Sequence, residues 1–404
     1  MDMPSNIEVT SQVMIEHATF TYSDFSISGI DFIDVRDYGA AGDGEMSDSS
    51  SFQKALDLAQ DKEELHIYVP EGIYRMTDTL HFYSNTTITL DSKAEIIRDH
   101  NGYLLMNGTS DISFRGYNGP GNIMIEGGIW NQNGVKRPAR ASAFTFKHAK
   151  GLTIRDLIIQ DSSDSHAIEL NSTYDATIDN VYFLGINNVS NNVGNEALQL
   201  DLAKGSTVNN ASYDNTPCKL ITIQNCYFGD SVTPGTHSWP RAIGSHSSTI
   251  GRWNEDIVIS NNKFENIEGW AIRAYSWNDV VINENEFINN EGGIAINSPF
   301  VSDPKDTVDV NGKQTNKSQT CSSYFINGNQ IKGNRPLTGG IKIIGERSGR
   351  ITDVEISNNI IELKESKYAL LLKRVERGTI YDNKILTTDP NNIIIKDSSE
   401  IENK

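Results

Sequence analysis

Cysteine, proline and long apolar runs are scarce in this sequence of 404 residues. The three cysteines, Cys218, Cys226 and Cys321, cannot all pair and lack the spacing of a metal site, so we expect neither a disulfide scaffold nor a bound metal. Cys226 lies in an aliphatic strand pattern and is interpreted as a buried, unreactive thiol. No stretch approaches the roughly 20 apolar residues of a membrane-spanning helix, so we expect no membrane contact.

Basic residues are also in deficit, with 35 Lys and Arg against 53 Asp and Glu, a net charge of −18. No basic stripe is present, which argues against nucleic acid as a partner. The same charge weakly disfavours a strongly anionic polymer as ligand. We expect no cofactor. The segment from Met1 to Tyr22 lacks the basic start and apolar run of a secretion signal.

The sequence does contain a repeated phrase, in which a small or turn-forming residue precedes two aliphatic residues that alternate with polar ones. Copies occupy residues 166–171, 196–201, 241–246, 270–275, 292–297, 339–344 and 368–373. Alternation with a period of two is typical of strands. Strands that recur every 22–30 residues or so indicate a solenoid whose coils stack into parallel sheets.

A second phrase lies between successive copies of the first and contains a recurrent Asn. Copies occupy residues 177–183, 222–228, 258–264, 281–287, 325–331, 355–361 and 379–385. Asn tolerates left-handed backbone angles, and its side chain can bond the amide of a neighbouring coil. The phrase therefore predicts a turn between two strands, with the Asn residues stacked in a ladder.

The N-terminal part predicts an end cap for the solenoid. Residues 1–30 form an irregular lead-in, and residues 31–404 are expected to be a single domain. Phe52, Ala55 and Leu56 are spaced as one face of a short helix at about 51–60. A helix laid across the first coil would cover its exposed strand edges.

Three segments carry a resemblance to a known family: Asp34–Gly44, Ile67–Tyr74 and Glu126–Gly134. They resemble the pectin-lyase-like superfamily of right-handed parallel β-helix proteins, which includes polygalacturonase-like glycosidases and phage tail-spike depolymerases. The resemblance implies an all-β fold, a right-handed parallel β-helix with a short N-terminal capping helix. Hydrolases, lyases and binding spikes share this opening, so it indicates the fold more than the reaction.

The sequence departs from each element of the polygalacturonase signature. That signature consists of an Asn-Thr-Asp strand, an Asp-Asp pair, Gly-His-Gly and Arg-Ile-Lys. The chain has Glu196–Asp201 in place of the first carboxylate strand, Arg241–His246 in place of the His-Gly strand, and Ala271–Tyr275 as a partial echo of the last. Pectin specificity is therefore not expected, although a polar cleft across neighbouring coils is.

The pleat of the strands predicts which side chains line that cleft. If the first aliphatic residue of each phrase points inward, the next residue points outward and stacks on its equivalents in neighbouring coils. The first outward column comprises Glu169, Gln199, Gly244, Arg273, Ala295 and Lys342, and the second comprises Asn171, Asp201, His246, Tyr275, Asn297, Ile344 and Lys373.

Glu169 and Asp201 are the predicted acid/base pair. They differ by one coil and two residues, a Cα offset of about 8 Å, which overlaps the roughly 6.5–9.5 Å carboxyl separation of inverting glycosidases. His246 is a third catalytic candidate, placed to tune Asp201 or to bind a sugar hydroxyl. Gln199 and Arg273 would position the substrate by hydrogen bonds.

Further residues complete the candidate site. Tyr275, Trp277 and Trp239 are expected to offer flat faces for sugar rings, and Arg241 is another candidate for substrate binding. Glu196 and Arg241 are equivalent in register, and an inter-coil ion pair is the favoured interpretation of these two residues. A second tier of rim candidates consists of Glu196, Asp161, Asp164 and His166. Long insertions at 203–217, 230–240 and 298–322 are expected to wall the cleft.

These observations favour a carbohydrate-active enzyme that hydrolyses a cell-surface or extracellular polysaccharide. A polysaccharide lyase of the same fold is the alternative within the enzymes, and a non-catalytic glycan-binding receptor or adhesin spike is the alternative outside them. A pair of carboxylates distinguishes these classes, because an acid/base hydrolase needs the pair and a non-catalytic binding protein does not. The spike resemblance and the missing secretion signal suggest an extracellular or phage-tail location and a homotrimer.

Overall fold

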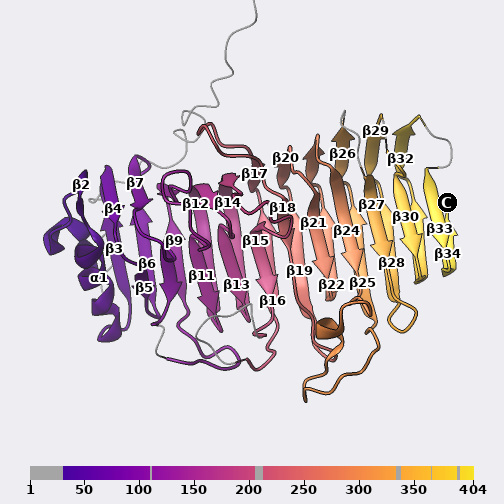
Figure 1. Ribbon diagram of the computed structural model, residues 1–404, viewed down its shortest axis with the longest axis horizontal. Coiled ribbons are helices and arrows are strands. Elements are labelled where there is room, and N and C mark those ends of the chain that lie inside the picture. The colour runs from indigo at the N-terminus through magenta and orange to yellow at the C-terminus, as the bar shows by residue number, and fades with distance from the viewer. Residues whose placement is uncertain (1–30, 110–111, 205–212, 334–337, 365, 389–391) are drawn as a thin grey trace, which may run out of the picture.

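The computed structural model describes residues 31–404 except 110–111, 205–212, 334–337, 365 and 389–391. The predicted lead-in, residues 1–30, lies outside the described residues. The described chain is a right-handed parallel β-helix, in which one coil follows another along a single axis (Figure 1). The predicted fold class is confirmed, and the single-domain boundary stays a prediction.

Two parallel sheets make up the described solenoid. Sheet A, the larger, contains β1 (Asp31–Asp34), β2 (Asp43–Ser47), β3 (Leu65–Val69), β4 (Gly72–Met76), β6 (Thr86–Leu90), β7 (Ala94–Arg98), β9 (Ile123–Glu126), β10 (Ile129–Asn131), β12 (Lys150–Ser163), β14 (Tyr174–Asn187), β16 (Lys219–Gln224), β17 (Tyr227–Gly229), β19 (Asn254–Ser260), β20 (Lys263–Glu265), β22 (Trp277–Asn283), β23 (Glu286–Ile288), β25 (Cys321–Asn327), β26 (Gln330–Gly333), β28 (Ile351–Ser357), β29 (Ile360–Leu363), β31 (Val375–Tyr381), β32 (Lys384–Thr387) and β34 (Ser399–Asn403). Sheet B contains β5 (Leu80–Phe82), β8 (Leu105–Asn107), β11 (Phe144–Lys147), β13 (Ile168–Asn171), β15 (Glu196–Asp201), β18 (Arg241–Gly244), β21 (Trp270–Tyr275), β24 (Gly292–Asn297), β27 (Gly339–Ile344), β30 (Leu370–Lys373) and β33 (Ile393–Lys396).

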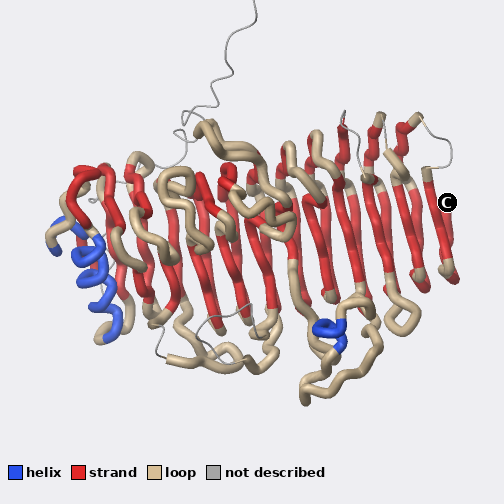
Figure 2. The backbone as a smooth tube through the Cα atoms, viewed as in Figure 1, coloured by secondary structure: helices blue, strands red, loops and turns tan. Residues whose placement is uncertain are grey.

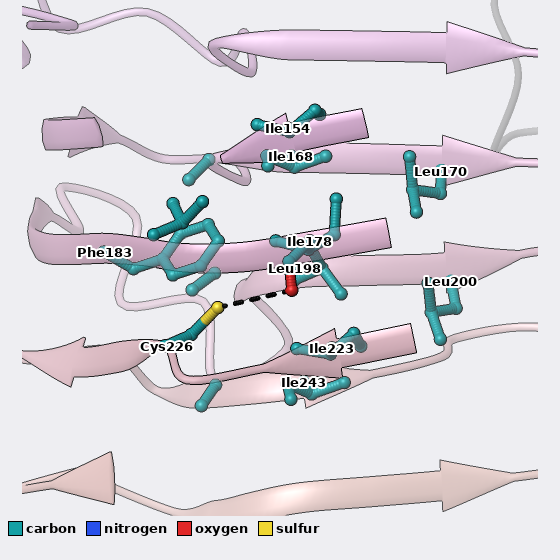
Figure 3. Close-up of a cluster of buried hydrophobic side chains, with 14 of the residues drawn as sticks. Ile154, Ile168, Leu170, Ile178, Phe183, Leu198, Leu200, Ile223, Cys226 and Ile243 are labelled. Atoms are coloured by element: carbon teal, nitrogen blue, oxygen red, sulfur yellow. Dashed lines mark hydrogen bonds between the residues drawn. The ribbon is translucent and has the colours of Figure 1, made fainter. Parts of the chain in front are cut away.

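The core is a set of stacked apolar columns. Ile168, Leu198 and Ile243 pair in register on successive strands of sheet B and are fully buried. Phe183 and Phe228 belong to the buried core and stack with their ring centroids 4.5 Å apart. Figure 3 shows Phe183 beside Cys226 and the aliphatic residues of neighbouring coils. Because parallel strands stack the equivalent positions of successive coils, each coil buries its apolar side chains against those of the next.

The Asn-containing phrase forms two structural features, a left-handed turn and a ladder of side-chain hydrogen bonds. Asn225 and Asn261 have φ angles of 55° and 56°, so they take the left-handed conformation predicted for a turn. A buried ladder follows one residue further on, where the Asn285 Oδ1 accepts the Asn262 amide at 3.0 Å and the Asn329 Oδ1 accepts the Asn285 amide at 3.0 Å. The predicted Asn ladder is confirmed. Cys226 occupies a rung of it, and burial raises the pKa of its thiol to about 12.

A short helix caps the N-terminal end, as predicted. Helix α1 (Ser49–Asp57) continues into the 3₁₀ turn η4 (Leu58–Gln60), while η3 (Val35–Tyr38) precedes it and η6 (Pro304–Thr307) lies in a later insertion. The apolar face of α1 buries Phe52, Ala55 and Leu56 at the end of the solenoid (Figure 2). No helix among the described residues has the length and apolar character to span a membrane.

Candidate active site

The first outward column predicted for sheet B is present in the register of its strands, whereas the second is interrupted at His246, which follows the end of β18 at Gly244. Glu169 pairs with Gln199, Gln199 with Gly244 and Gly244 with Arg273. The same column continues through Ala295 to Lys342. Asn171 pairs with Asp201, which confirms that Glu169 and Asp201 differ by one coil and two residues.

A groove of about 650 Å³ opens over β13, β15 and the segment after β18. Its lining combines acidic, basic, imidazole and amide groups. The lining residues are Tyr103, Arg140, Asp164, Ser165, His166, Glu169, Asn192, Asn195, Gln199, Lys204, His246, Ser247, Lys305 and Asp306. Five of the predicted site residues are thus brought together: Glu169, Gln199, His246, Asp164 and His166.

Glu169 presents its carboxylate to this groove from β13. Its Oε1 accepts a hydrogen bond of 2.5 Å from the Ser142 hydroxyl, and its Oε2 lies 3.5 Å from the Thr145 hydroxyl. Thr145 pairs with Glu169 in the register of β11 and β13. Two neutral hydroxyl donors therefore hold the carboxylate in place, and the charge of Glu169 acts on the nearby side chains of Lys147 and His166.

Glu196 forms the buried centre of a second cluster at the groove. It is fully buried, and its Oε1 accepts from the Arg241 guanidinium at 3.1 Å, which confirms the predicted inter-coil ion pair. Its Oε2 bonds the Nε2 of His246. Gly244 leaves room for this carboxylate, because a Cβ at that position would lie 3.0 Å from the Glu196 Oε1. His166 Nδ1 lies 2.8 Å from the Glu196 main-chain oxygen.

These contacts set opposite charges on Glu196 and His246. Burial opposes ionisation of Glu196, but His246 and Arg241 outweigh it and lower the pKa of Glu196 to about 2. Burial likewise opposes the imidazolium, yet the charge of Glu196 and the hydrogen bond to it raise the pKa of His246. The buried carboxylate therefore favours the protonated form of an imidazole that lines the groove.

Asp201 departs from the predicted role. It is fully buried beneath the groove, and its oxygens accept from the Gln199 side chain at 2.6 Å and from the Ser247 amide and hydroxyl at 3.1 and 2.9 Å. His246 reaches Asp201 only through its main-chain amide, at 3.2 Å. Asp201 therefore holds the turn after β18 in place. The prediction that it exchanges protons with a substrate is wrong, because its carboxylate is enclosed by donors.

The aromatic residues predicted to stack on sugars belong to the core. Trp239, Trp277 and Tyr275 are all fully buried. The indole of Trp277 donates to the Ser245 hydroxyl at 2.6 Å, and the Tyr275 hydroxyl donates to Asp306 at 2.7 Å. These three predictions are wrong for one physical reason: a large aromatic ring gains more free energy from burial than from exposure.

The predicted rim divides into two parts. Asp164 lines the groove and accepts from the Ser190 amide at 2.9 Å. Asp161 is buried and accepts from the hydroxyls of Ser231 and Thr233 at 2.5 and 2.7 Å, so it anchors the 230–240 insertion. The prediction of Asp161 as a rim residue is therefore corrected.

Sequence reasoning missed the groups that the insertions bring in. Lys204, at the start of the 203–217 insertion, and Lys305 and Asp306, from the 298–322 insertion, line the groove. Burial raises the pKa of Asp306. In the sequence, only the length of the insertions indicated a functional role for them. No sequence pattern predicts that Asp306 contacts Tyr275 on β21.

His166, Glu196 and His246 also satisfy the donor types and spacing of a metal site, since their ligand atoms all lie within 4.8 Å of one another. Both oxygens of Glu196 already bond Arg241 and His246. We therefore interpret the cluster as a mutually neutralised group of charges.

A cationic strip extends from the groove along the first outward column. Arg273 lies with its guanidinium 4.5 Å from the Tyr275 ring centroid, and Lys342 lies with its ammonium 4.3 Å from that of Trp270. Burial, then repulsion from Arg273 and Arg241, lower the pKa of Lys342 to about 8. Among the residues that the structure describes, no carboxylate pairs with Arg273 or Lys342. The strip is thus a concentration of uncompensated positive charge on an acidic protein.

Comparison with known proteins agrees with the fold. A family model described as "Rhamnogalacturonase A/epimerase, pectate lyase-like" matches residues 32–295. The plasmin and fibronectin-binding protein A of Streptococcus pneumoniae (strain ATCC BAA-255 / R6) is 27% identical over 413 residues, 91% of this chain and 55% of that protein. The chain therefore spans about half the length of this relative.

Solved structures resemble the solenoid over nearly its whole length. The Streptococcus pneumoniae surface protein and adhesin PfbA has a TM-score of 0.72 at 22% identity, covering 92% of this chain and 100% of that one. The tailspike protein of E. coli bacteriophage HK620, in complex with a pentasaccharide, has a TM-score of 0.65 at 12% identity, covering 92% and 66%. Identities this low show a common fold alone.

Proposed function

Because the chain belongs to the rhamnogalacturonase A/epimerase, pectate lyase-like family, we propose that it binds an acidic extracellular polysaccharide along sheet B and hydrolyses it in the groove. The observation that carries this proposal is the continuous outward column from Glu169 to Lys342, with the ion-paired His246 beside its acidic end. The column offers the Glu169 carboxylate, with the His246 imidazole beside it, at one end and the cations Arg273 and Lys342 at the other.

The proposed reaction is acid/base catalysis. His246 donates its proton to the glycosidic oxygen as the bond from that oxygen to the anomeric carbon breaks. Glu169 accepts a proton from the water that attacks the anomeric carbon, so one proton enters the substrate and one leaves. Glu196 keeps His246 protonated and oriented and touches no substrate itself. Solvent then returns the proton from Glu169 to His246.

The cationic strip supports an acidic glycan as substrate. Arg273 and Lys342 lie two coils apart on strands β21 and β27, in line with Glu169. Guanidinium and ammonium groups without carboxylate partners are suited to the carboxylates of uronate sugars. The net charge of −18 is therefore a poor guide to the ligand here, because local positive charge is concentrated where a chain of sugars would lie.

A second candidate function is glycan binding without cleavage. The pneumococcal relative and the structure of PfbA both carry the name of a binding protein or adhesin. In this case the groove and the strip keep their role in recognition, and His246, held by the buried Glu196, binds the sugar. Both candidate functions imply a location outside the cell or on a surface.

We also propose a homotrimer, from the likeness to tailspikes. Light scattering tests this proposal, and a monomer would contradict it.

The test is incubation with a panel of uronate-containing polysaccharides and a neutral glucan, followed by measurement of reducing ends and ultraviolet absorbance. Hydrolysis gives new reducing ends without absorbance, and we expect that result on an acidic polymer only. Absorbing products would identify a lyase instead. Binding without either product would identify the adhesin.

The matched variant is Glu169→Gln, which keeps the shape and hydrogen-bonding capacity of the side chain but removes its proton transfer. We expect the rate to fall about 100-fold or more, within the usual contribution of a general base, while binding is kept. Asp164→Asn, at the same groove, serves as the control and should retain most of the rate. Wild-type turnover by Glu169→Gln would exclude Glu169 as the base.

A further inference from the structure

A column of left-handed residues runs along the outer surface of sheet A. It comprises Asp175, Leu220, Asp256, Asp279, Ser323, Asp353, Arg377 and Glu400, which follow from the registers of successive long strands. The φ angles of these residues lie between 52° and 66°. Asp and Ser suit such positions because short polar side chains bond the local backbone.

Leu220 is the apolar member of this column, whose other members are polar or charged. Its φ is 55°, a conformation that penalises a leucine, and its side chain is 44% exposed, so no burial in the core offsets the penalty. A leucine here serves neither the turn nor solubility. Local strain combined with an exposed apolar side chain indicates a contact made with something outside the chain.

The adjacent outward column of sheet A extends the apolar surface around Leu220. Val258, Val281 and Phe325 pair in register on β19, β22 and β25, and Phe325 is 37% exposed. Together with Leu220 they line a shallow hollow of about 760 Å³. Over these three coils the outer face of sheet A is therefore apolar, whereas solvated sheet faces are usually polar.

Carboxylates surround this apolar surface. Asp175, Asp256, Asp279, Asp353 and Glu355 line the hollow, and no Lys or Arg does. Among the described residues, the carboxylates of Asp175, Asp256 and Asp279 have no hydrogen-bond or ion-pair partner, whereas Asp353 pairs with Arg377 at 2.8 Å. We call this surface, from Asp175 to Glu355, the acidic-apolar face.

We propose that the acidic-apolar face binds an extended, basic segment of a partner protein. Lysine or arginine side chains of the partner would neutralise the ladder of Asp256 and Asp279, and its apolar side chains would cover Leu220 and Phe325. A second copy of this chain would bring the same carboxylates into opposition, and an acidic glycan would be repelled. The face lies on sheet A and the groove on sheet B, so partner and glycan bind independently.

The experiment uses a short fluorescent peptide in which lysine alternates with leucine, titrated against the full chain by anisotropy. A matched peptide with glutamate in place of lysine is the ligand control. We expect the lysine peptide to bind and the glutamate peptide not to. The double variant Asp256→Asn/Asp279→Asn should weaken binding about tenfold, the sum expected of two exposed charge pairs. Asn accepts left-handed φ angles, so both sites should fold.

Leu220→Asn separates binding from folding. It relieves the left-handed leucine and removes the exposed apolar side chain, so we expect equal or higher thermal stability with weaker peptide binding. Matched controls are Leu386→Asn, which is also 44% exposed, and Asp382→Asn, which has a φ of 54°. Equal binding by test and control variants, or binding of the glutamate peptide, would overturn the proposal. A change of oligomeric state in the double variant would overturn it as well, in favour of an interface between copies.

Discussion

The Nε2 of His246 bonds the carboxylate of Glu196, which lies on the preceding coil of sheet B. Glu196 is fully buried and also bound by Arg241, while His246 reaches the groove. A half-buried imidazole is thus held by an enclosed carboxylate. This arrangement links the charge of the buried residue to the proton affinity of the residue that faces solvent.

Substitution Glu196→Gln should shift the pH dependence of the reaction. Glu196 raises the pKa of His246, so removing its charge lowers that pKa. Activity that requires the protonated imidazole is present below the pKa of His246 and lost above it. The alkaline limb of the rate profile should therefore move to lower pH, as read from the initial rate at each pH and from an NMR titration of the His246 ring. An unmoved limb would show that His246 is not the acid.

Arg273→Ala and Lys342→Ala should weaken glycan binding more than turnover. Each removes one partly buried cation from the strip, and we expect an affinity loss of about tenfold or more. Binding to the wild type should also decline as the pH rises through about 8, the pKa of Lys342, since only the ammonium attracts an anion. Calorimetry at two salt concentrations checks this result, with Lys384→Ala on sheet A as the control. Salt-independent binding would contradict the role of the strip.

Asp201→Asn should change how stability depends on pH. Burial raises the pKa of Asp201 to about 6 from 3.8. Between these values the folded state holds a proton that the unfolded state has lost, so the contribution of Asp201 is full below about 4 and is lost as the pH rises through about 6.

The asparagine variant lacks this titration. Relative to the wild type it should therefore gain up to about 3 kcal/mol between pH 4 and pH 7, at ~1.4 kcal/mol per pKa unit. Denaturant unfolding at both pH values measures the difference. The same difference in free energy of unfolding between the two proteins at both pH values would contradict the raised pKa of Asp201.

Asn285→Ala should destabilise the solenoid. The Asn285 side chain accepts the amide of Asn262 at 3.0 Å and donates to the carbonyl of Ile259 at 2.9 Å. Removing it leaves both buried main-chain groups without a partner, at a cost of roughly 1–3 kcal/mol for each. Thermal unfolding measures the loss, and Asn311→Ala, on an exposed loop, should be neutral. Equal melting temperatures for the two variants would show that the ladder is not needed.

The sequence by itself determined the coil, the register and the capping helix. Apolar alternation at Ile168, Leu198 and Ile243 fixes which face is buried, and a parallel stack then places Glu169, Gln199 and Arg273 in one outward line. These features follow from local periodicity, because each coil buries apolar side chains at the same positions of its repeat. Asn at the turns adds a second, independent mark of the same period.

Only the tertiary structure decided which outward residues reach solvent. Asp201, Tyr275, Trp239 and Trp277 have the periodicity or composition of a cleft, yet loops and turns enclose them. Conversely, Asp306 reaches the groove from an insertion without any repeat. Burial at these positions depends on how irregular segments fold back over the sheet. That folding is set by contacts between residues far apart in the chain, which periodicity does not encode.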